Sequence, residues 1–143
     1  VVVFACNWCS YAGADYAGVS RLQYPSSIRI VRTMCSGRVD EKFIWRAFEN
    51  GAPVVLVSGC HIGDCHYIDA NKWTVKRIEK VRKKMDKLGI RPDRLRLEWI
   101  SAAEGVRFAR IMEEMEALRK EVTQEEINET KEILSRKKKK KKK

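Results

Sequence analysis

The chain has 143 residues, of which 44% are hydrophobic, and a formal net charge of +11. This length is enough for one domain whose core can fold without disulfide bonds. The last eight residues, Arg136 to Lys143, carry eight positive charges and leave +3 for the rest, so the charge does not indicate a specific nucleic-acid-binding domain. We expect the lysine run to be a disordered, solvated tail that binds polyanions without specificity.

The cysteine content points to a reducing compartment. The number of cysteines is odd, and no secretory leader is recognisable before the first of them. No apolar stretch approaches the roughly 20 residues that are needed to cross a bilayer. We therefore predict a cytoplasmic protein with no membrane segment, whose thiols are available for chemistry.

Short β-branched runs alternate along the chain with longer stretches in which apolar residues lie three and four apart, which predicts alternating strands and helices. In chain order the predicted elements are a strand at 1–5, a helix at 13–23, a strand at 27–32, a helix at 39–50, a strand at 53–57, a helix at 69–88, a strand at 94–99 and a helix from 101. Ser101 and Glu104 form a predicted capping box at that last start. A second box, Thr123 and Glu126, predicts a short charged helix that ends near residue 134.

This order of elements predicts an α/β fold, a four-stranded, mostly parallel sheet with helices on both faces. Residues 1–122 are predicted to form the α/β domain. Residues 123–143 are predicted to be a charged helical extension with a lysine-rich tail, which projects from the domain or docks on another protein chain. In such folds the functional loops lie at the carboxyl ends of the strands. Trp99 ends the last predicted strand without a cysteine, so we expect it to border the site without binding it.

The cysteines follow three of the four predicted strands. They are Cys6 and Cys9 after the first strand, Cys35 after the second, and Cys60 and Cys65 after the third. If these strands are parallel neighbours, thiols about fifty residues apart in the sequence can meet around one centre. The pattern therefore predicts a metal or redox site at the carboxyl ends of the strands.

Four thiolates suit either zinc or the irons of an iron–sulfur cluster. Glycines beside the cysteines, namely Gly37, Gly59 and Gly63, let the backbone turn tightly and direct amide hydrogens at sulfur, which tunes a reduction potential. This favours a cluster over a single zinc ion. His61 and His66 each follow a cysteine directly, and we expect them to form hydrogen bonds near the site or to pack.

Two other functions fit part of the pattern. A stand-alone thiol–disulfide oxidoreductase would use Cys6 and Cys9 as its dithiol, although the other three thiols are then unexplained. A zinc-stabilised binding module would use the same sulfurs, although structural zinc usually supports a smaller core than this one.

Aromatic and basic residues near the predicted site offer possible contact surfaces. Trp8, Tyr11 and Tyr67 lie beside the cysteine loops, where they shield the site, anchor an interface or simply pack. The third predicted helix has a basic face, which is a solvated surface or, if functional, a docking face for an acidic partner protein rather than for nucleic acid. Its members are Lys72, Lys76, Arg77, Lys80, Lys83, Lys84 and Lys87.

At the cysteine motifs, from about Phe4 to Arg119, the chain resembles the delta subunit of the methyl-viologen-reducing nickel–iron hydrogenases of methanogenic archaea. The resemblance is carried by CNWCSYAGAD, RTMCSGRVD and GCHIGDCHY. It implies a [2Fe-2S] protein that links the hydrogenase to heterodisulfide reductase and passes electrons to the flavin of that partner's large subunit, where bifurcation takes place. It also implies formate dehydrogenase as an alternative donor.

We therefore expect a one-electron relay that makes or breaks no substrate bond itself. A [2Fe-2S] cluster needs four protein ligands, so four of the five cysteines, Cys6, Cys9, Cys35, Cys60 and Cys65, are predicted to bind it. The sequence leaves open which cysteine is the fifth. The lysine tail is not part of the family pattern, and no specific nucleic acid or membrane partner is expected.

Overall fold

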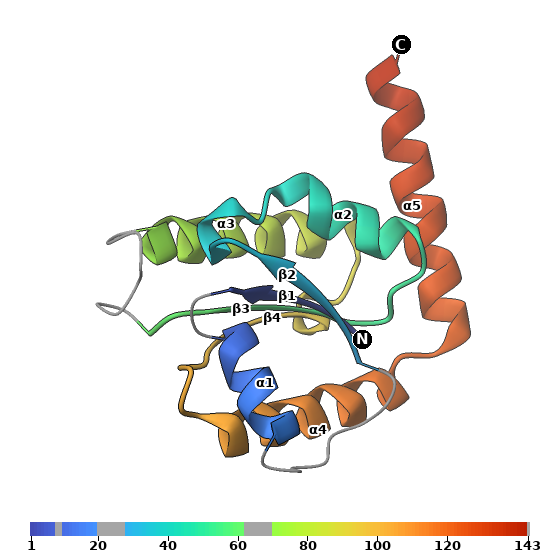
Figure 1. The fold of residues 1–143 in the computed structure, drawn as a ribbon. Helices are drawn as coiled ribbons and strands as arrows, with labels where there is room; N and C mark the ends of the chain where they lie inside the picture. The colour runs from blue at the N-terminus through green and yellow to red at the C-terminus, as the bar shows by residue number, and fades with distance from the viewer. Residues whose placement is uncertain (8–9, 20–27, 62–69, 143) are drawn as a thin grey trace.

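A computed structural model describes residues 1–7, 10–19, 28–61 and 70–142. Its centre is one sheet of four strands in the order β2-β1-β3-β4, and every neighbouring pair is parallel. The strands are β1 (Val2–Cys6), β2 (Arg29–Thr33), β3 (Val55–Gly59) and β4 (Leu95–Trp99). All four carboxyl ends therefore lie along one edge of the sheet (Figure 1).

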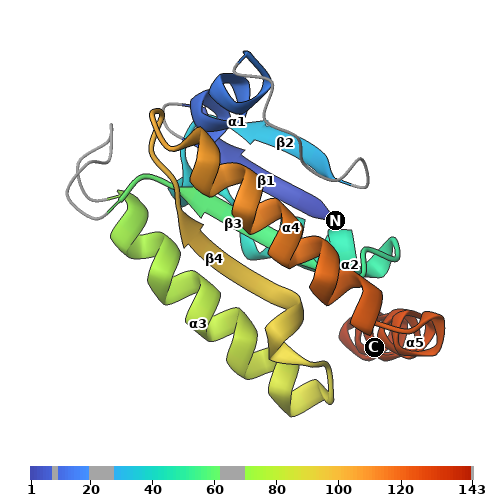
Figure 2. The ribbon, with the colours of Figure 1, turned by 90° about the horizontal axis from the view of Figure 1, so that it is seen from below.

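Helices cover both faces of this sheet, which confirms the predicted α/β fold. Helices α1 (Ser10–Val19) and α4 (Gly105–Glu121) lie on one face, and α2 (Glu41–Glu49) and α3 (Ala70–Leu88) lie on the other (Figures 1 and 2). Helix α5 (Gln124–Lys142) packs beside α2. Two short 3-10 helices, η1 (Ser36–Arg38) and η2 (Pro92–Arg94), complete the described elements.

The alternation of side chains along the strands divides the core in two. Val3, Ala5 and Leu56 point to the face that packs against α1 and α4. Phe4, Val55 and Val57 point to the opposite face, which packs against α2 and α3. Because β1 and β3 lie inside the sheet and are buried on both faces, they read as almost continuous apolar runs in the sequence.

Helix α4 begins at Gly105, so the prediction of a helix start at residue 101 is wrong. Glu104 is the residue that precedes the first turn, and its side chain does not cap it. Its carboxylate instead accepts the backbone N–H of Ser101 at 2.9 Å. Half of the predicted capping box is therefore present, but it orders the turn between β4 and α4 rather than the helix itself.

Helix α5 is longer than predicted. Its start agrees with the second capping box, since the N–H of Glu126 donates to Thr123 Oγ1 at 3.2 Å. It continues through the lysine run to Lys142, so the expected disordered tail is a helix instead. Up to Leu134 the helix packs on the domain's own core, and beyond that residue it projects from the body (Figure 1). The domain boundary at residue 122 stays a prediction.

The projecting part of α5 has two contacts with α2. The ammonium of Lys137 lies 4.9 Å from the centre of the Trp45 ring, and Lys138 Nζ lies 2.6 Å from Glu49 Oε2. No helix in the described part of the chain is long and apolar enough to cross a membrane.

Candidate metal centre

Three of the five cysteines lie in the described residues, and all three are at the carboxyl edge of the sheet. Cys6 is the last residue of β1, Cys35 comes two residues after β2, and Cys60 directly follows β3. Each side chain is at most 3% exposed. Cys9 and Cys65 lie outside the described residues.

Cys6 and Cys60 are brought into direct contact. Their Sγ atoms are 3.9 Å apart, and the two residues form a small buried cluster of their own. Two thiolates bound to one tetrahedral metal, with metal–sulfur bonds of about 2.3 Å, lie about 3.8 Å apart. The observed separation therefore fits a pair of ligands on one metal ion. No group of three or more Cys, His, Asp or Glu side chains that could hold a metal occurs within residues 1–7, 10–19, 28–61 and 70–142.

The sulfur of Cys35 receives a backbone hydrogen bond. Cys35 precedes η1, and its Sγ accepts the N–H of Gly37 at 3.4 Å. An amide directed at sulfur stabilises the thiolate, which agrees with the role predicted for this glycine. Of the other two glycines, Gly63 lies outside the described residues and Gly59 has a different role.

Gly59 lets two cysteine loops approach each other closely. A Cβ atom at this position would lie 2.6 Å from Ser36 Oγ, 2.8 Å from Ser36 Cβ and 3.0 Å from the ring of Trp99. Distances below 3.0 Å are not reached by real side chains, so only glycine allows the end of β3 to touch the turn that follows Cys35. Trp99 borders this edge of the sheet, as predicted.

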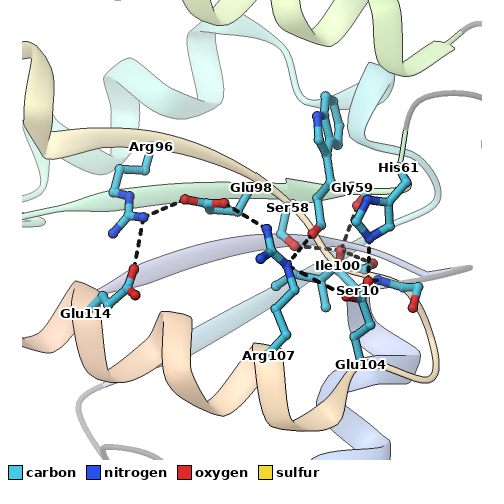
Figure 3. Close-up of polar contacts among 12 residues, drawn as sticks. Ser10, Ser58, Gly59, His61, Arg96, Glu98, Ile100, Glu104, Arg107 and Glu114 are labelled. Atoms are coloured by element: carbon cyan, nitrogen blue, oxygen red, sulfur yellow. Dashed lines mark hydrogen bonds and ion pairs between the residues drawn. The ribbon is translucent and has the colours of Figure 1, made fainter.

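A chain of buried hydroxyls joins three elements beside the thiols. The Ser58 hydroxyl donates to Ser10 Oγ at 2.6 Å. The Ser10 hydroxyl lies 3.3 Å from the carbonyl oxygens of Gly59 and Ile100 (Figure 3). Because Ser10 begins α1 directly after Cys9, these bonds fix the start of that helix to the ends of β3 and β4.

Asn71, on the first turn of α3, holds the backbone that carries Cys60. Its side-chain amide donates to the carbonyl oxygens of Cys60 and His61 at 3.0 and 3.1 Å. The side chain is fully buried, and its Oδ1 has no hydrogen-bond partner among the described atoms. A buried acceptor without a partner is uncommon in proteins and marks a place that another group could complete.

Two further contacts join α3 to the turn after Cys35. The Thr74 hydroxyl donates to Ser36 Oγ at 3.2 Å. Arg77 Nη1 donates to the carbonyl oxygens of Gly37 and Val39, each at 2.8 Å. Helix α3 is therefore bonded to the loops of both Cys35 and Cys60.

An ionic group lies on the other side of Cys60 (Figure 3). His61 Nε2 forms a hydrogen bond with Glu104 Oε1, which also accepts the Ser101 N–H. These two bonds, that of His61 first, lower the pKa of Glu104 to about 2. Arg107 continues the group, because its Nε donates to the Trp99 carbonyl at 2.9 Å. His61 thus forms a hydrogen bond near the thiols, one of its two predicted roles, and His66 lies outside the described residues.

Sequence reasoning missed the polar residues that hold the site. Five of the seven buried polar residues of the described chain lie around the cysteines: Ser10, Ser36, Ser58, Asn71 and Thr74. A signal for three of them is present, because Cys9 and Cys35 are each followed by a serine and Ser58 comes two residues before Cys60. Tyr11 packs against the core beside α1, while Trp8 and Tyr67 lie outside the described residues.

Comparison with known proteins gives a consistent picture. Residues 1–134 match the family described as methyl-viologen-reducing hydrogenase, delta subunit. An iron-sulfur subunit of the F420-non-reducing hydrogenase of Archaeoglobus profundus is 50% identical over 117 residues, which are 82% of this chain and 85% of that protein. The iron-sulfur subunit of the vhc F420-non-reducing hydrogenase of Methanococcus voltae is 54% identical over 109 residues, 76% of this chain and 75% of that protein.

A third relative is much longer. This subunit of the ferredoxin/F(420)H(2)-dependent CoB-CoM heterodisulfide reductase of Methanosarcina acetivorans is 49% identical over 114 residues, which are 80% of this chain but 14% of that protein. We refer to this type of protein as the long reductase subunit. The same domain thus occurs both as most of a small chain and as a segment of a large one.

Proposed function

The chain belongs to the methyl-viologen-reducing hydrogenase delta-subunit family, and we propose that it is an electron-transfer protein carrying one [2Fe-2S] cluster. The observation that carries this proposal is the contact of Cys6 and Cys60, two buried thiols 54 positions apart in the sequence whose sulfurs are 3.9 Å apart. The names of relatives that are iron-sulfur subunits support the same chemistry.

Four of the five cysteines, Cys6, Cys9, Cys35, Cys60 and Cys65, bind the cluster in this proposal. The contact and spacing of Cys6 and Cys60 favour both as ligands, on the same iron. The other two ligands then come from Cys9, Cys35 and Cys65, and one of these three is dispensable. The Gly37 amide at the Cys35 sulfur favours Cys35 as a ligand, because it stabilises the thiolate form.

The cluster, when bound, supplies a one-electron carrier, and the chain itself makes or breaks no substrate bond. The donor is a hydrogenase, or formate dehydrogenase in its place, and the acceptor is the flavin-containing component of heterodisulfide reductase. The relay then feeds electron bifurcation in methanogenesis, in the cytoplasm. The names of relatives that belong to hydrogenases or to heterodisulfide reductases support these two neighbours.

The contribution of this chain is to place and insulate the thiols. Burial keeps water from the sulfurs, and the bonds from Ser10, Asn71 and Gly37 hold the three loops in register. Both burial and amide hydrogen bonds to sulfur are known to set the potential of such centres.

Anaerobic purification tests the proposal. We expect about two irons and two acid-labile sulfides per chain, with visible absorption that dithionite bleaches. Colourless protein with one zinc ion would instead identify a zinc-stabilised module. Colourless, metal-free protein that reduces disulfides would identify a thiol oxidoreductase.

Single replacements of cysteine by serine test the ligand set. We expect Cys6→Ser and Cys60→Ser to lose most of the iron, and one of the replacements at positions 9, 35 and 65 to keep it. Retention of a full, spectroscopically unchanged cluster in Cys6→Ser would contradict the assignment of this pair. Circular dichroism of each variant separates loss of iron from loss of the fold.

A further inference from the structure

Two large apolar side chains are exposed beside the cysteine edge of the sheet. Met34, directly before Cys35, is 51% exposed, and its carbonyl oxygen lies 3.9 Å from Cys6 Sγ. Trp73 is 62% exposed and lies two residues after Asn71, which holds the Cys60 backbone. Tryptophan and methionine are enriched in the centres of protein interfaces, and an exposed tryptophan beside a functional site is unusual on a surface that only meets water.

These two side chains belong to one rigid unit. Trp73 is on the first turns of α3, which lie beside the turn that follows β2 and Met34 (Figure 1). The bonds of Arg77 to Gly37 and Val39, together with the Thr74–Ser36 bond, tie the helix to that turn. A surface that is already ordered loses little conformational entropy when a partner binds, which favours affinity.

The charge around this surface is positive. The Lys76 ammonium lies 4.7 Å from the centre of the Trp73 ring, and Arg38 is exposed on η1. A basic rim around an apolar centre complements a partner face with an apolar centre and carboxylates around it. The tryptophan ring and the ammonium would then be buried together, where a cation–π contact is strongest.

We propose that Met34 and Trp73, with Arg38 and Lys76 around them, form the docking surface for an acidic face of the long reductase subunit. This inference rests on the proposed function and names the partner at that same site. The choice of partner follows from the Methanosarcina relatives, in which a domain 49% identical to this one is a segment of the long reductase subunit itself. A surface that meets the rest of that protein inside one chain there is exposed when the domain is a separate chain.

The position of this surface suits electron transfer. Met34 adjoins Cys35 and contacts Cys6 through its carbonyl oxygen, so a partner seated on it lies over the buried thiols. The rival apolar surface is a groove of about 680 Å³ between β2 and α2, which includes Val31 and the half-exposed Phe43. This groove extends to Val2 and Ala52, toward the opposite end of the strands.

Binding of the anaerobically purified chain to the purified long reductase subunit from the same organism tests the proposal. Isothermal titration calorimetry gives the Kd, and iron analysis of the same samples gives the cluster content. We expect Trp73→Ala to raise the Kd by about tenfold or more and Met34→Ala to raise it several-fold. Phe43→Ala is the matched control, also an exposed apolar side chain, and is expected to change the Kd by less than about twofold.

The charged rim is tested by the rate of association. Lys76→Glu and Arg38→Glu are expected to lower the association rate constant and to weaken its dependence on salt. Lys120→Glu, an exposed site at the end of α4, is the control of equal charge change. Equal effects of all three replacements would mean that net charge alone acts, and would overturn the role of this rim.

Three further outcomes would overturn the docking surface: no binding of wild-type protein to the long reductase subunit, unchanged affinity in both Trp73→Ala and Trp73→Gln, or a larger loss in Phe43→Ala than in Trp73→Ala. The last result would move the interface to the groove beside β2. Failure of the proposed function is seen separately, as wild-type protein without iron.

Discussion

The two ends of the sheet are held together by different means. At the carboxyl end, buried neutral groups on four elements and their loops share the work, among them Ser10, Asn71 and Thr74. At the amino end, one fully buried cation, Arg94, donates to the carbonyl oxygens of Pro53 and Ala52 and to the Thr130 hydroxyl, at 2.7, 3.3 and 2.5 Å.

The difference reflects what each end has to do. The Arg94 side chain fastens α5 to the sheet, and although burial lowers the pKa of its guanidinium, arginine stays charged at neutral pH. A permanent buried charge next to thiolates would shift their pKa values and the potential of any metal they bind. Neutral hydroxyls and amides can position loops without that effect. We therefore expect damage at the amino end to be concentrated in one residue and damage at the carboxyl end to be distributed.

The largest expected effect is at the amino end. Arg94→Met removes three hydrogen bonds and leaves buried acceptors without donors, so the free energy of unfolding should fall by about 3 kcal/mol. Urea denaturation measures this. Arg91→Met is the control, since Arg91 is 42% exposed and its ion pairs with Glu121 and Glu126 are long, and it should cost less than about 1 kcal/mol. Similar losses in both variants would mean that Arg94 is no special anchor.

The next effect tests close packing at the carboxyl end. Gly59→Ala places a Cβ 2.8 Å from Ser36 Cβ, and we expect a loss of about 2 kcal/mol in the free energy of unfolding, together with a lower iron content. The double variant Gly59→Ala with Ser36→Gly removes the clash and should recover part of both. Gly89→Ala is a different case, because its Cβ would meet nothing within 4 Å and only its φ of +78° is strained. Full stability of Gly59→Ala would show that the loops can separate freely.

A smaller effect is expected at Asn71. Asn71→Ala removes two bonds to backbone carbonyls but also removes an Oδ1 that has no described partner, so the loss of stability should be about 1 kcal/mol. Iron should leave this variant faster when a chelator is added, because the Cys60 backbone is less well held. Asn50→Ala breaks a comparable bond, to the Arg46 carbonyl, on the exposed end of α2, and should not change the rate of iron loss.

The smallest effect depends on pH. The pKa of Glu104 is about 2 in the folded protein and 4.5 as an ordinary value, so its stabilising contribution is complete above pH 4.5 and is lost as the pH falls toward 2. The pair with His61 is about one-third exposed, which limits the contribution to less than about 1 kcal/mol. The difference in unfolding free energy between wild type and Glu104→Gln should therefore shrink between pH 6 and pH 3. A difference that is constant over this range would contradict the assignment.

The fold could be predicted from the sequence because burial leaves a periodic pattern. The apolar runs of β1 and β3 and the seam of α4 each identify an element and a face. The first three strands end one or two residues later than predicted, since residues such as Cys6 and Gly59 extend the ladders. The helix at the lysine run was missed because like charges disfavour a helix, and neither the Arg94 anchor nor the contacts of Lys137 and Lys138 with α2 leave a local pattern.

The site was predicted in part. The location of Cys6, Cys35 and Cys60 at strand ends follows from their place after apolar runs. The contact between Cys6 and Cys60 needs the strand order, which is not written in any local pattern. Asn71 was missed because a buried asparagine on the first turn of a helix reads in the sequence like a solvated one.

Cys6 differs from a cysteine in a loop in one further way. It is the last residue of β1, an inner strand, and is paired with Thr33 of β2, while the next residue, Asn7, still donates to the Thr33 carbonyl at 2.7 Å. A sulfur mounted on that ladder cannot shift without breaking it. An electron arriving at such a centre finds at least one bond whose length and direction change little with oxidation state, and a small structural rearrangement is what lets an electron hop quickly in both directions.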